Sequence, residues 1–285
     1  MSKLVYQPRT DFFIEISVLN LNILLNPQTF EVNIDDDTRN KITTLLEESS
    51  NSNIICFPEF SYNESLFEIY KQFSDENNVI IIGGSGLEEV EGGFYAFCPV
   101  FIPNKELIKV YKRYLTIEER TYSRGQLLPY PNPTERHFRI EQNNDEYVFS
   151  IYICYDFLQD TYDSRSDIVF IPQFEKSPRH FINEANKIVQ GFDNFVLGIN
   201  NSDNSMRSIG FANLNKSMIQ AFSSMNIRRK HYKDQDDEFL NEHHTIIYDI
   251  IDEQRISFRL NLANPVPKPY NFSYSNYEPS VLVLK

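Results

Sequence analysis

The chain has 285 residues, of which 41% are hydrophobic and 24% are charged, a composition typical of a globular protein that buries a sizeable core. Its 27 basic and 40 acidic side chains give a net charge of −13, which opposes binding to nucleic acid or to an anionic membrane surface because both are negatively charged. The longest apolar runs are too short to cross a bilayer and the N-terminal segment lacks the apolar stretch of a signal peptide, so we expect a cytoplasmic protein.

Strand-like and helical segments alternate in the first part of the chain. The segment 37–50 is predicted to be a helix, because Ile42, Leu45 and Leu46 recur at helical spacing and acidic residues stand near its start. The apolar run 79–86 ends in glycines, which we interpret as closing a strand rather than binding phosphate. In chain order, the predicted elements are a strand at 12–23, a helix at 37–50, a strand at 53–57, a helix at 65–76 and a strand at 79–86.

The rest of the chain continues this alternation. Residues 94–102 and 107–115 are predicted to pair as strands around the turn sequence PNKE. Because several strands are apolar throughout, we predict an α/β protein with a largely covered sheet, folded as a single domain over 1–285. A divergent charged segment at 200–245 interrupts the pattern, and a Pro- and Tyr-rich surface tail at 263–285 ends it. The other predicted elements are strands at 147–154, 167–172, 195–200 and 245–262 and a helix at 181–194.

Three reactive side chains follow predicted strands, namely Glu59, Lys112 and Cys154. Ligands of α/β proteins collect beyond the carboxyl ends of strands, so these positions are candidates for chemistry. Taken singly, each has a plain structural interpretation: the cysteine fills core space, as we expect of Cys56 and Cys98, the glutamate caps a helix and the lysine lies on the surface. The three cysteines contain no CxxC pair and the five histidines show no metal-ligand spacing, so we expect no metal and no disulfide framework.

Taken together, the three side chains are the parts required for acyl transfer. A cysteine is a good nucleophile only as a thiolate and therefore needs a base or a cation beside it. A glutamate that leaves an apolar strand is partly desolvated, which raises its pKa and makes it a usable base. A lysine held nearby stabilises the oxyanion of a tetrahedral intermediate.

The order of the three segments FPEF, YKRYL and ICYDF resembles the motifs of the nitrilase, or carbon–nitrogen hydrolase, superfamily. Glu59 follows Pro58, Lys112 stands three residues before Leu115, and Cys154 precedes an aromatic residue and an acid. The spacings of 53 and 42 residues between glutamate, lysine and cysteine are normal for that family. The resemblance implies a four-layer αββα sandwich and a homodimer or larger homo-oligomer.

The resemblance also implies a role for each residue. Cys154 is expected to be the nucleophile that forms a thioester, Glu59 the base, and Lys112 with the backbone N–H of Tyr155 the oxyanion stabiliser. Tyr155 and Phe174 are expected to bind the substrate. That substrate is a small molecule with a non-peptide carbon–nitrogen bond, more readily a linear amide than a nitrile, and no metal or organic cofactor is required.

The family keeps a second glutamate, for which the segment EERTYSRG offers two candidates. The match has no gaps when Glu118 takes this place, with Tyr122 as the aromatic residue and Gly125 as the glycine. Glu119 is the competing choice. If the segment is extended, the two side chains point to opposite sides, so we expect Glu118 to face the site and to orient Lys112 or the leaving nitrogen.

Three departures from the family pattern leave other functions open. Leu158 stands four residues after the cysteine, where the family often has an arginine, and the segment 226–244 has no clear counterpart. The usual Gly-Ser turn after the strand at 195–200 is also missing. One alternative is a nitrilase-like interaction module with reduced or no activity in a larger assembly, with the 200–245 region as its contact surface. The other is an α/β binding protein without chemistry.

Overall fold

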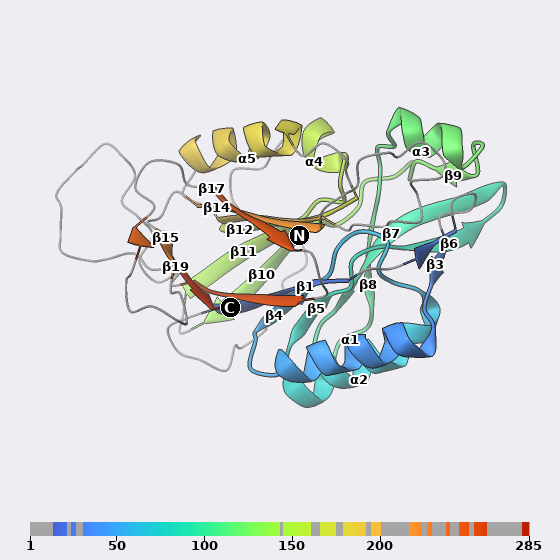
Figure 1. Ribbon diagram of the computed structural model, residues 1–285. Coiled ribbons are helices and arrows are strands. Elements are labelled where there is room, and N and C mark those ends of the chain that lie inside the picture. The colour runs from blue at the N-terminus through green and yellow to red at the C-terminus, as the bar shows by residue number, and fades with distance from the viewer. Residues whose placement is uncertain are drawn as a thin grey trace.

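The computed structural model describes residues 14–21, 24–26, 31–142, 145–160, 166–174, 179–191, 195–200, 217–223, 227–229, 238–239, 245–250, 254–260 and 281–284. These residues form four layers, in which two β-sheets pack face to face and helices cover the outer face of each sheet (Figure 1). The helices α1 and α2 cover one sheet, and α4 and α5 cover the other. This is the αββα arrangement predicted from the sequence.

The larger sheet contains eleven strands among the described residues. Its central strands β1 (Ile14–Asn20), β4 (Ile54–Cys56) and β5 (Ile80–Ile82) run parallel, and β7 (Gly93–Phe101) pairs antiparallel with β5. Both β4 and β5 are buried throughout, as expected of parallel strands covered on both faces. The other strands of this sheet are β6 (Gly86–Val90), β8 (Ile108–Tyr111), β9 (Leu127–Leu128), β15 (Ile227–Arg229), β16 (Glu238–Phe239), β18 (Gln254–Leu260) and β19 (Val281–Leu284).

The smaller sheet has six strands in the described part of the chain. Its centre is the parallel set β11 (Asp145–Ile151), β12 (Ile168–Gln173) and β13 (Phe195–Asn200). Antiparallel strands extend this set on both sides. Cys154, the nucleophile candidate, follows β11 of the central set. These neighbours are β10 (His137–Gln142), β14 (Ser217–Ser223) and β17 (Thr245–Ile250), and a separate ribbon pairs β2 (Leu24–Leu25) with β3 (Val32–Asn33).

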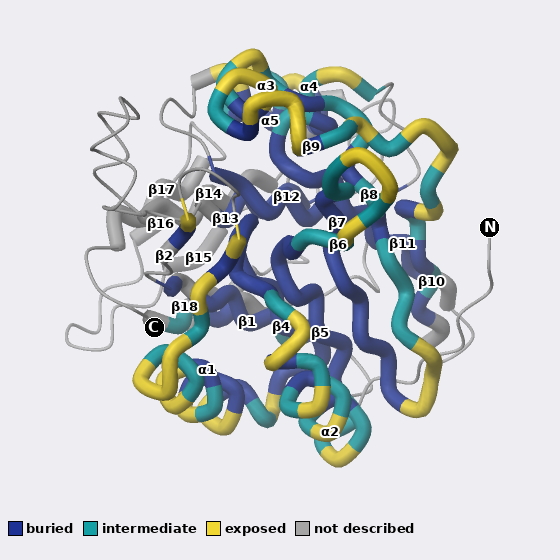
Figure 2. The backbone as a smooth tube through the Cα atoms, turned by 90° about the vertical axis from the view of Figure 1, so that its right-hand side faces the viewer, coloured by how far each residue is buried: buried dark blue, intermediate teal, exposed yellow. Residues whose placement is uncertain are grey.

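Each covering helix buries one face and exposes the other. The helix α1 (Asp36–Glu48) begins after Asp35, whose carboxylate accepts the N–H of Thr38, and it buries the three apolar residues that predicted it. Figure 2 shows the central strands buried and the outer sides of the helices exposed. No helix among the described residues is long and apolar enough to span a membrane. The other helices are η1 (Glu64–Leu66), α2 (Phe67–Asn77), α3 (Ile117–Tyr122), α4 (Asp156–Gln159) and α5 (Arg179–Gly191).

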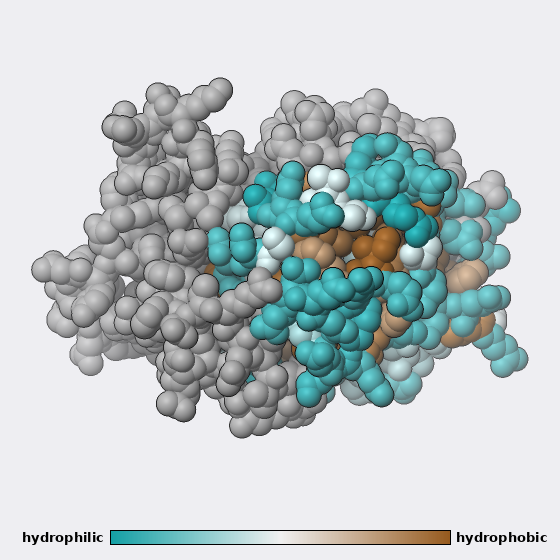
Figure 3. Space-filling model, turned by 90° about the horizontal axis from the view of Figure 1, so that it is seen from below, coloured by the Kyte–Doolittle hydropathy of each residue, from teal (hydrophilic) through white to brown (hydrophobic). Residues whose placement is uncertain are grey.

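The apolar core of the described residues divides into two large clusters and one small one, the small one of Ala96, Leu115 and Leu127. The largest cluster joins the two sheets and α5 and includes Ile16, Phe149 and Phe170. The other large cluster lies between the larger sheet and its helices and includes Leu46 and Tyr70. Seen from the side of α1 and α2, polar side chains dominate the described surface, with apolar side chains visible between them (Figure 3).

Two local features bear on the sequence analysis. The argument that Glu118 and Glu119 point to opposite sides held only for an extended segment, and 117–122 is instead the helix α3. Residues 281–284, at the end of the predicted tail, form β19, which pairs with β18 and β15. The rest of 263–285, and much of 200–245, lies outside the described residues.

Candidate active site

Glu59 lies in a tight turn that follows β4. The next residue, Phe60, has a left-handed backbone with φ of 55°, and its N–H donates to Ser85 Oγ at 2.9 Å. Ser61 Oγ donates to the carbonyl of Pro58 at 2.5 Å. A non-glycine residue in the left-handed region is costly, so these bonds hold the turn that points Glu59 into the protein.

Gly84 explains why the glycines after β5 are needed. Its φ is +77°, and a Cβ built there would lie 2.1 Å from the carbonyl oxygen of Pro58 and 2.0 Å from Ser61 Oγ. No other residue fits so close to the neighbouring backbone. Gly84 therefore shapes the turn of Glu59, which agrees with the interpretation of these glycines as closing a strand.

Lys112 follows β8 and is fully buried together with Glu59. Its Nζ lies 2.7 Å from Glu59 Oε1 and also bonds to Glu119 Oε1. Burial opposes the charge of Lys112, but the carboxylates of Glu119 and Glu59 outweigh it and hold the pKa of the ammonium well above its usual value. Lys112 is therefore charged at neutral pH.

The second carboxylate bonded to Lys112 belongs to Glu119, the competing candidate, and the role expected of Glu118 stays a prediction. Glu119 is buried at the third position of α3 and forms a capping box with Thr116. Its Oε2 accepts the Thr116 N–H at 2.8 Å while its Oε1 accepts from Lys112. Glu118 is half-buried and lines a cavity instead.

Cys154 lies in the turn between β11 and α4, so it follows an apolar strand as the sequence predicted. Its φ is 46°, in the left-handed region, and its N–H donates to the carbonyl of Pro172 at 2.8 Å. The carbonyl of Cys154 accepts the N–H of Phe157 at 3.0 Å. Strain of this kind costs about 1 to 3 kcal/mol and persists only where surrounding bonds enforce it.

Burial controls the proton equilibria of the site. It raises the pKa of Glu59 to about 7, against the ammonium of Lys112 and a hydrogen bond with the Cys154 thiol, which lower it. Burial also raises the pKa of the Cys154 thiol well above its usual value, aided by the charge of Glu59 and opposed by Lys112. The resting cysteine is therefore a thiol, and the group bonded to it is a carboxylate able to take its proton near neutral pH.

The two predicted substrate-binding residues lie beside Cys154. The backbone N–H of Phe174 bonds to the thiol, and its ring meets Phe60 edge-on with centroids 5.4 Å apart. Tyr155 is half-buried and lines a cavity of about 530 Å³ between α3, α4 and α5, together with Glu118 and His180. Figure 1 and Figure 2 both show these three helices side by side. Substrate binding by Tyr155 and Phe174 stays a prediction.

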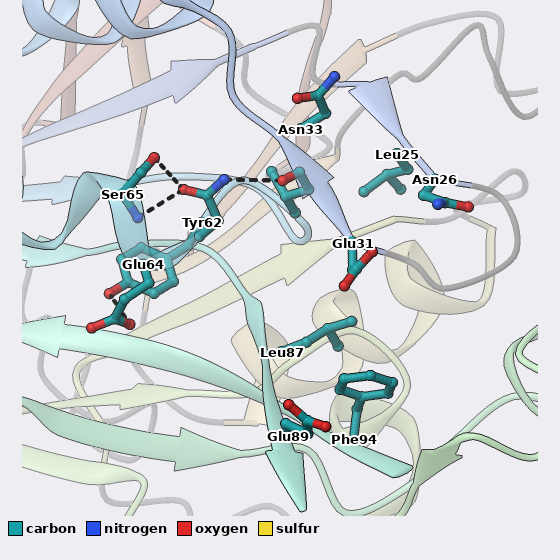
Figure 4. Close-up of a pocket in the computed structure, with 12 residues that line it drawn as sticks. Leu25, Asn26, Glu31, Asn33, Tyr62, Glu64, Ser65, Leu87, Glu89 and Phe94 are labelled. Atoms are coloured by element: carbon teal, nitrogen blue, oxygen red, sulfur yellow. Dashed lines mark hydrogen bonds between the residues drawn. The ribbon is translucent and has the colours of Figure 1, made fainter.

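A second cavity, of about 1000 Å³, lies between the β2–β3 ribbon, the segment after Glu59 and the hairpin of β6 and β7 (Figure 4). Glu31 and Glu89 reach it from facing elements, and Leu87 and Phe94 form an apolar floor. The three reactive residues line neither of these two cavities. Among the described residues, no group of acids, histidines or cysteines is arranged to hold a metal ion.

Sequence reasoning missed two further residues that surround the reactive ones. Asp156 is fully buried and accepts the backbone N–H groups of Arg113 and Tyr114 at 3.1 and 2.7 Å. Arg136, just before β10, is buried and donates to the same carboxylate at 2.8 Å. Asp156 had a signal in the Cys-aromatic-acid motif, whereas nothing in the local sequence of Arg136 marks it.

No family model matches the chain, and no curated protein matches its sequence. Its fold is similar to that of Saccharomyces cerevisiae Nit3, a member of branch 10 of the nitrilase superfamily, with a TM-score of 0.58 and 15% identity over 92% of this chain and 97% of that one. It is also similar to a carbon–nitrogen hydrolase from Helicobacter pylori G27, with a TM-score of 0.57 and 12% identity over 90% and 91% of the two chains. A third similar structure is XC1258 from Xanthomonas campestris, a CN-hydrolase superfamily protein with an arsenic adduct in its active site, with a TM-score of 0.56 and 14% identity over 88% and 91%. This chain therefore has the fold of the nitrilase, or carbon–nitrogen hydrolase, superfamily.

Proposed function

We propose that this chain is a thiol hydrolase that cleaves a non-peptide carbon–nitrogen bond in a small molecule, with a linear amide as the substrate class. The observation that carries the proposal is the buried contact between Glu59, Lys112 and Cys154, three residues from separate strand ends. A buried lysine between two carboxylates beside a strained cysteine is an expensive arrangement for a purely structural core. Perturbed groups of this kind concentrate at functional sites.

The first half of the reaction forms a thioester. Glu59 takes the thiol proton, and the sulfur of Cys154 attacks the amide carbon. The resulting oxyanion is stabilised by Lys112 and the backbone N–H of Tyr155. Glu59 then passes its proton to the nitrogen, the carbon–nitrogen bond breaks, and ammonia or an amine leaves.

The second half restores the enzyme. Glu59 takes a proton from a water molecule, whose oxygen attacks the thioester carbon. The carbon–sulfur bond breaks, the carboxylic acid leaves, and the thiol of Cys154 recovers its proton. The pKa of Glu59 near 7 suits a group that accepts and returns a proton in each half.

Brief alkylation of the native protein with iodoacetamide tests the nucleophile. Burial raises the pKa of all three thiols, so Cys56 and Cys98 are internal controls. Their sulfurs contact backbone carbonyls, which take up no proton, whereas Cys154 is bonded to a carboxylate. We expect peptide mapping to find Cys154 modified first, and equal protection of the three thiols would contradict the assignment.

A panel of small amides, ureides and nitriles tests the activity. Ammonia release from an amide, abolished in Cys154→Ala, is the expected result. Glu59→Gln should accumulate an acyl adduct on Cys154 that intact mass detects, because the base for deacylation is missing. Turnover that survives in Cys154→Ala would refute the mechanism.

A further inference from the structure

A buried ion cluster surrounds the short helix that follows the nucleophile. Arg136 Nη2 donates to Asp156 Oδ2 at 2.8 Å, and its Nη1 pairs with Asp160. Asp156 begins α4 and Asp160 follows its last residue as the C-cap, so one guanidinium contacts both ends of the helix. The guanidinium also lies over the ring of Tyr152, with its carbon 5.4 Å from the ring centroid.

On its other side, Asp156 holds the backbone next to Lys112. Asp156 Oδ1 accepts the N–H of Tyr114 at 2.7 Å, and both carboxylate oxygens lie 3.1 Å from the N–H of Arg113. These two amides directly follow Lys112, whose own N–H donates to the carbonyl of Ala96 at 2.9 Å. The lysine is therefore fixed by the sheet before it and by Asp156 after it.

We propose that Arg136, which lies outside all three motifs, is a positioning residue for the proposed reaction: its guanidinium fixes the carboxylate of Asp156, and Asp156 in turn fixes the backbone that carries Lys112. This inference rests on the proposed function. It also accounts for Leu158, which stands where the resembling family often has an arginine and packs here against the apolar core. This chain places a cation on α4 from the segment just before β10.

The charges around Asp156 agree with this role. Burial raises the pKa of Asp156 to about 6, and Arg136 is the main group that opposes the rise, followed by Lys112. Asp160 shares Arg136 and is itself 3.5 Å from Arg113 Nη1. Without Arg136, Asp156 would take up a proton at higher pH and lose the charge that holds the two backbone amides.

The competing interpretation is a cluster with a structural role alone. Buried ion pairs are weak evidence for stability, because well-packed apolar replacements often cost little. A melting temperature cannot separate the two views. The pH dependence of the site separates them, since a merely structural pair leaves it unchanged.

The test compares Arg136→Met, Arg136→Lys, Asp156→Asn and the double variant Arg136→Met/Asp156→Asn. Arg113→Met is the matched control, because its side chain contacts Asp160 and is about one third exposed. Three readouts are followed against pH: alkylation of Cys154 by iodoacetamide, hydrolysis of the best amide in the panel, and the ¹³C signal of the Asp156 carboxyl group, assigned with Asp156→Asn.

In Arg136→Met, we expect the Asp156 titration to move to higher pH by about one to two pH units. The acid limb of both rates, which Glu59 sets near pH 7 in the original protein, should move to higher pH by up to about one unit. A move of this size lowers the rate at pH 7 severalfold, and the rate recovers at higher pH. Arg136→Lys, which keeps the charge but not the fork of donors, should show a smaller move. The double variant should match Asp156→Asn, and Arg113→Met should match the original protein.

An unchanged Asp156 titration and unchanged pH profiles in Arg136→Met would overturn the inference, whatever happens to the melting temperature. If Arg136→Met does not fold, Arg136→Lys decides, and an unmoved titration there has the same meaning. A failure of the proposed function looks different: Cys154 would resist alkylation and no amide would be cleaved in the original protein. The carboxyl titration then still decides whether Arg136 governs Asp156.

Discussion

Glu119→Gln is the sharpest test of how the site uses its second carboxylate. The substitution keeps the shape of the side chain and the acceptor for the Thr116 N–H, so the capping box persists. It removes one of the two negative charges beside the ammonium of Lys112. Lys112 is then neutralised by Glu59 alone.

The two expected effects differ greatly in size. Stability should change by less than about 1 kcal/mol, because the buried cluster changes from two carboxylates and one ammonium to a single neutral pair. An ion pair at about 4 Å in an effective dielectric constant of ~20 is worth roughly 4 kcal/mol, and most of this is offset by lost repulsion between Glu59 and Glu119. Turnover should fall by about 10² to 10³-fold, because Lys112 is no longer held toward the oxyanion.

The pH profile supplies a signed prediction. Glu119 raises the pKa of Glu59, so its removal should lower that pKa from its value of about 7. The base must be ionised to accept the thiol proton, and activity is lost as pH falls through the pKa of Glu59. The acid limb should therefore move to lower pH in Glu119→Gln, opposite to the move expected in Arg136→Met.

The assay is steady-state kinetics from pH 5 to 9 on the best amide of the panel, with Glu118→Gln as the matched control. Glu118 is the adjacent carboxylate on the same helix, and its loss should change turnover and stability little. A large loss of turnover in Glu118→Gln together with unchanged turnover in Glu119→Gln would refute the assignment made from the Lys112 contact. An acid limb that moves to higher pH in Glu119→Gln would refute the electrostatic argument.

Three other predictions follow from local geometry. Gly84→Ala should destabilise the fold by about 2 kcal/mol or more and abolish turnover. Gly92 also has a positive φ but has open space around it, so Gly92→Ala should show only the cost of the backbone strain, and melting curves and kinetics compare the two variants. Thr116→Ala should cost about 1 kcal/mol in chemical denaturation and lower turnover by loosening Glu119, while Thr116→Ser should restore both. In the original protein, turnover should rise as pH increases through about 7, where Glu59 ionises; a rate that falls over this range contradicts its role as base.

The local pattern of the sequence predicts an α/β protein and marks the three reactive residues, whereas the order of the four layers was implied by the resemblance of the motifs. Glu59, Lys112 and Cys154 each end an apolar strand, and such ends lie where sheets present side chains to ligands. The sequence left Glu118 and Glu119 as alternatives, and the gapless match favoured Glu118. A local signal pointed to Glu119, because the sequence TIEE from 116 to 119 is a capping box that indicates a helix start.

Arg136 and Gly84 could not be assigned from sequence, since their importance comes from contacts across the fold. Arg136 reaches Asp156 only because β10 pairs with β11 and brings the start of one strand beside the end of the next. Gly84 is required because a Cβ at this position would lie only 2.1 Å from the carbonyl oxygen of Pro58. No local pattern records either distance.

The division of the Glu119 carboxylate between Thr116 and Lys112 links a backbone amide to the charge cluster. One oxygen accepts the Thr116 N–H, and the other accepts from the ammonium. Any change that draws the carboxylate away from Thr116, such as displacement of the lysine by a bound acyl group, exposes that amide to solvent. Hydrogen exchange and the NMR shift of the Thr116 amide therefore report occupancy of the site without a label on the cysteine and without turnover.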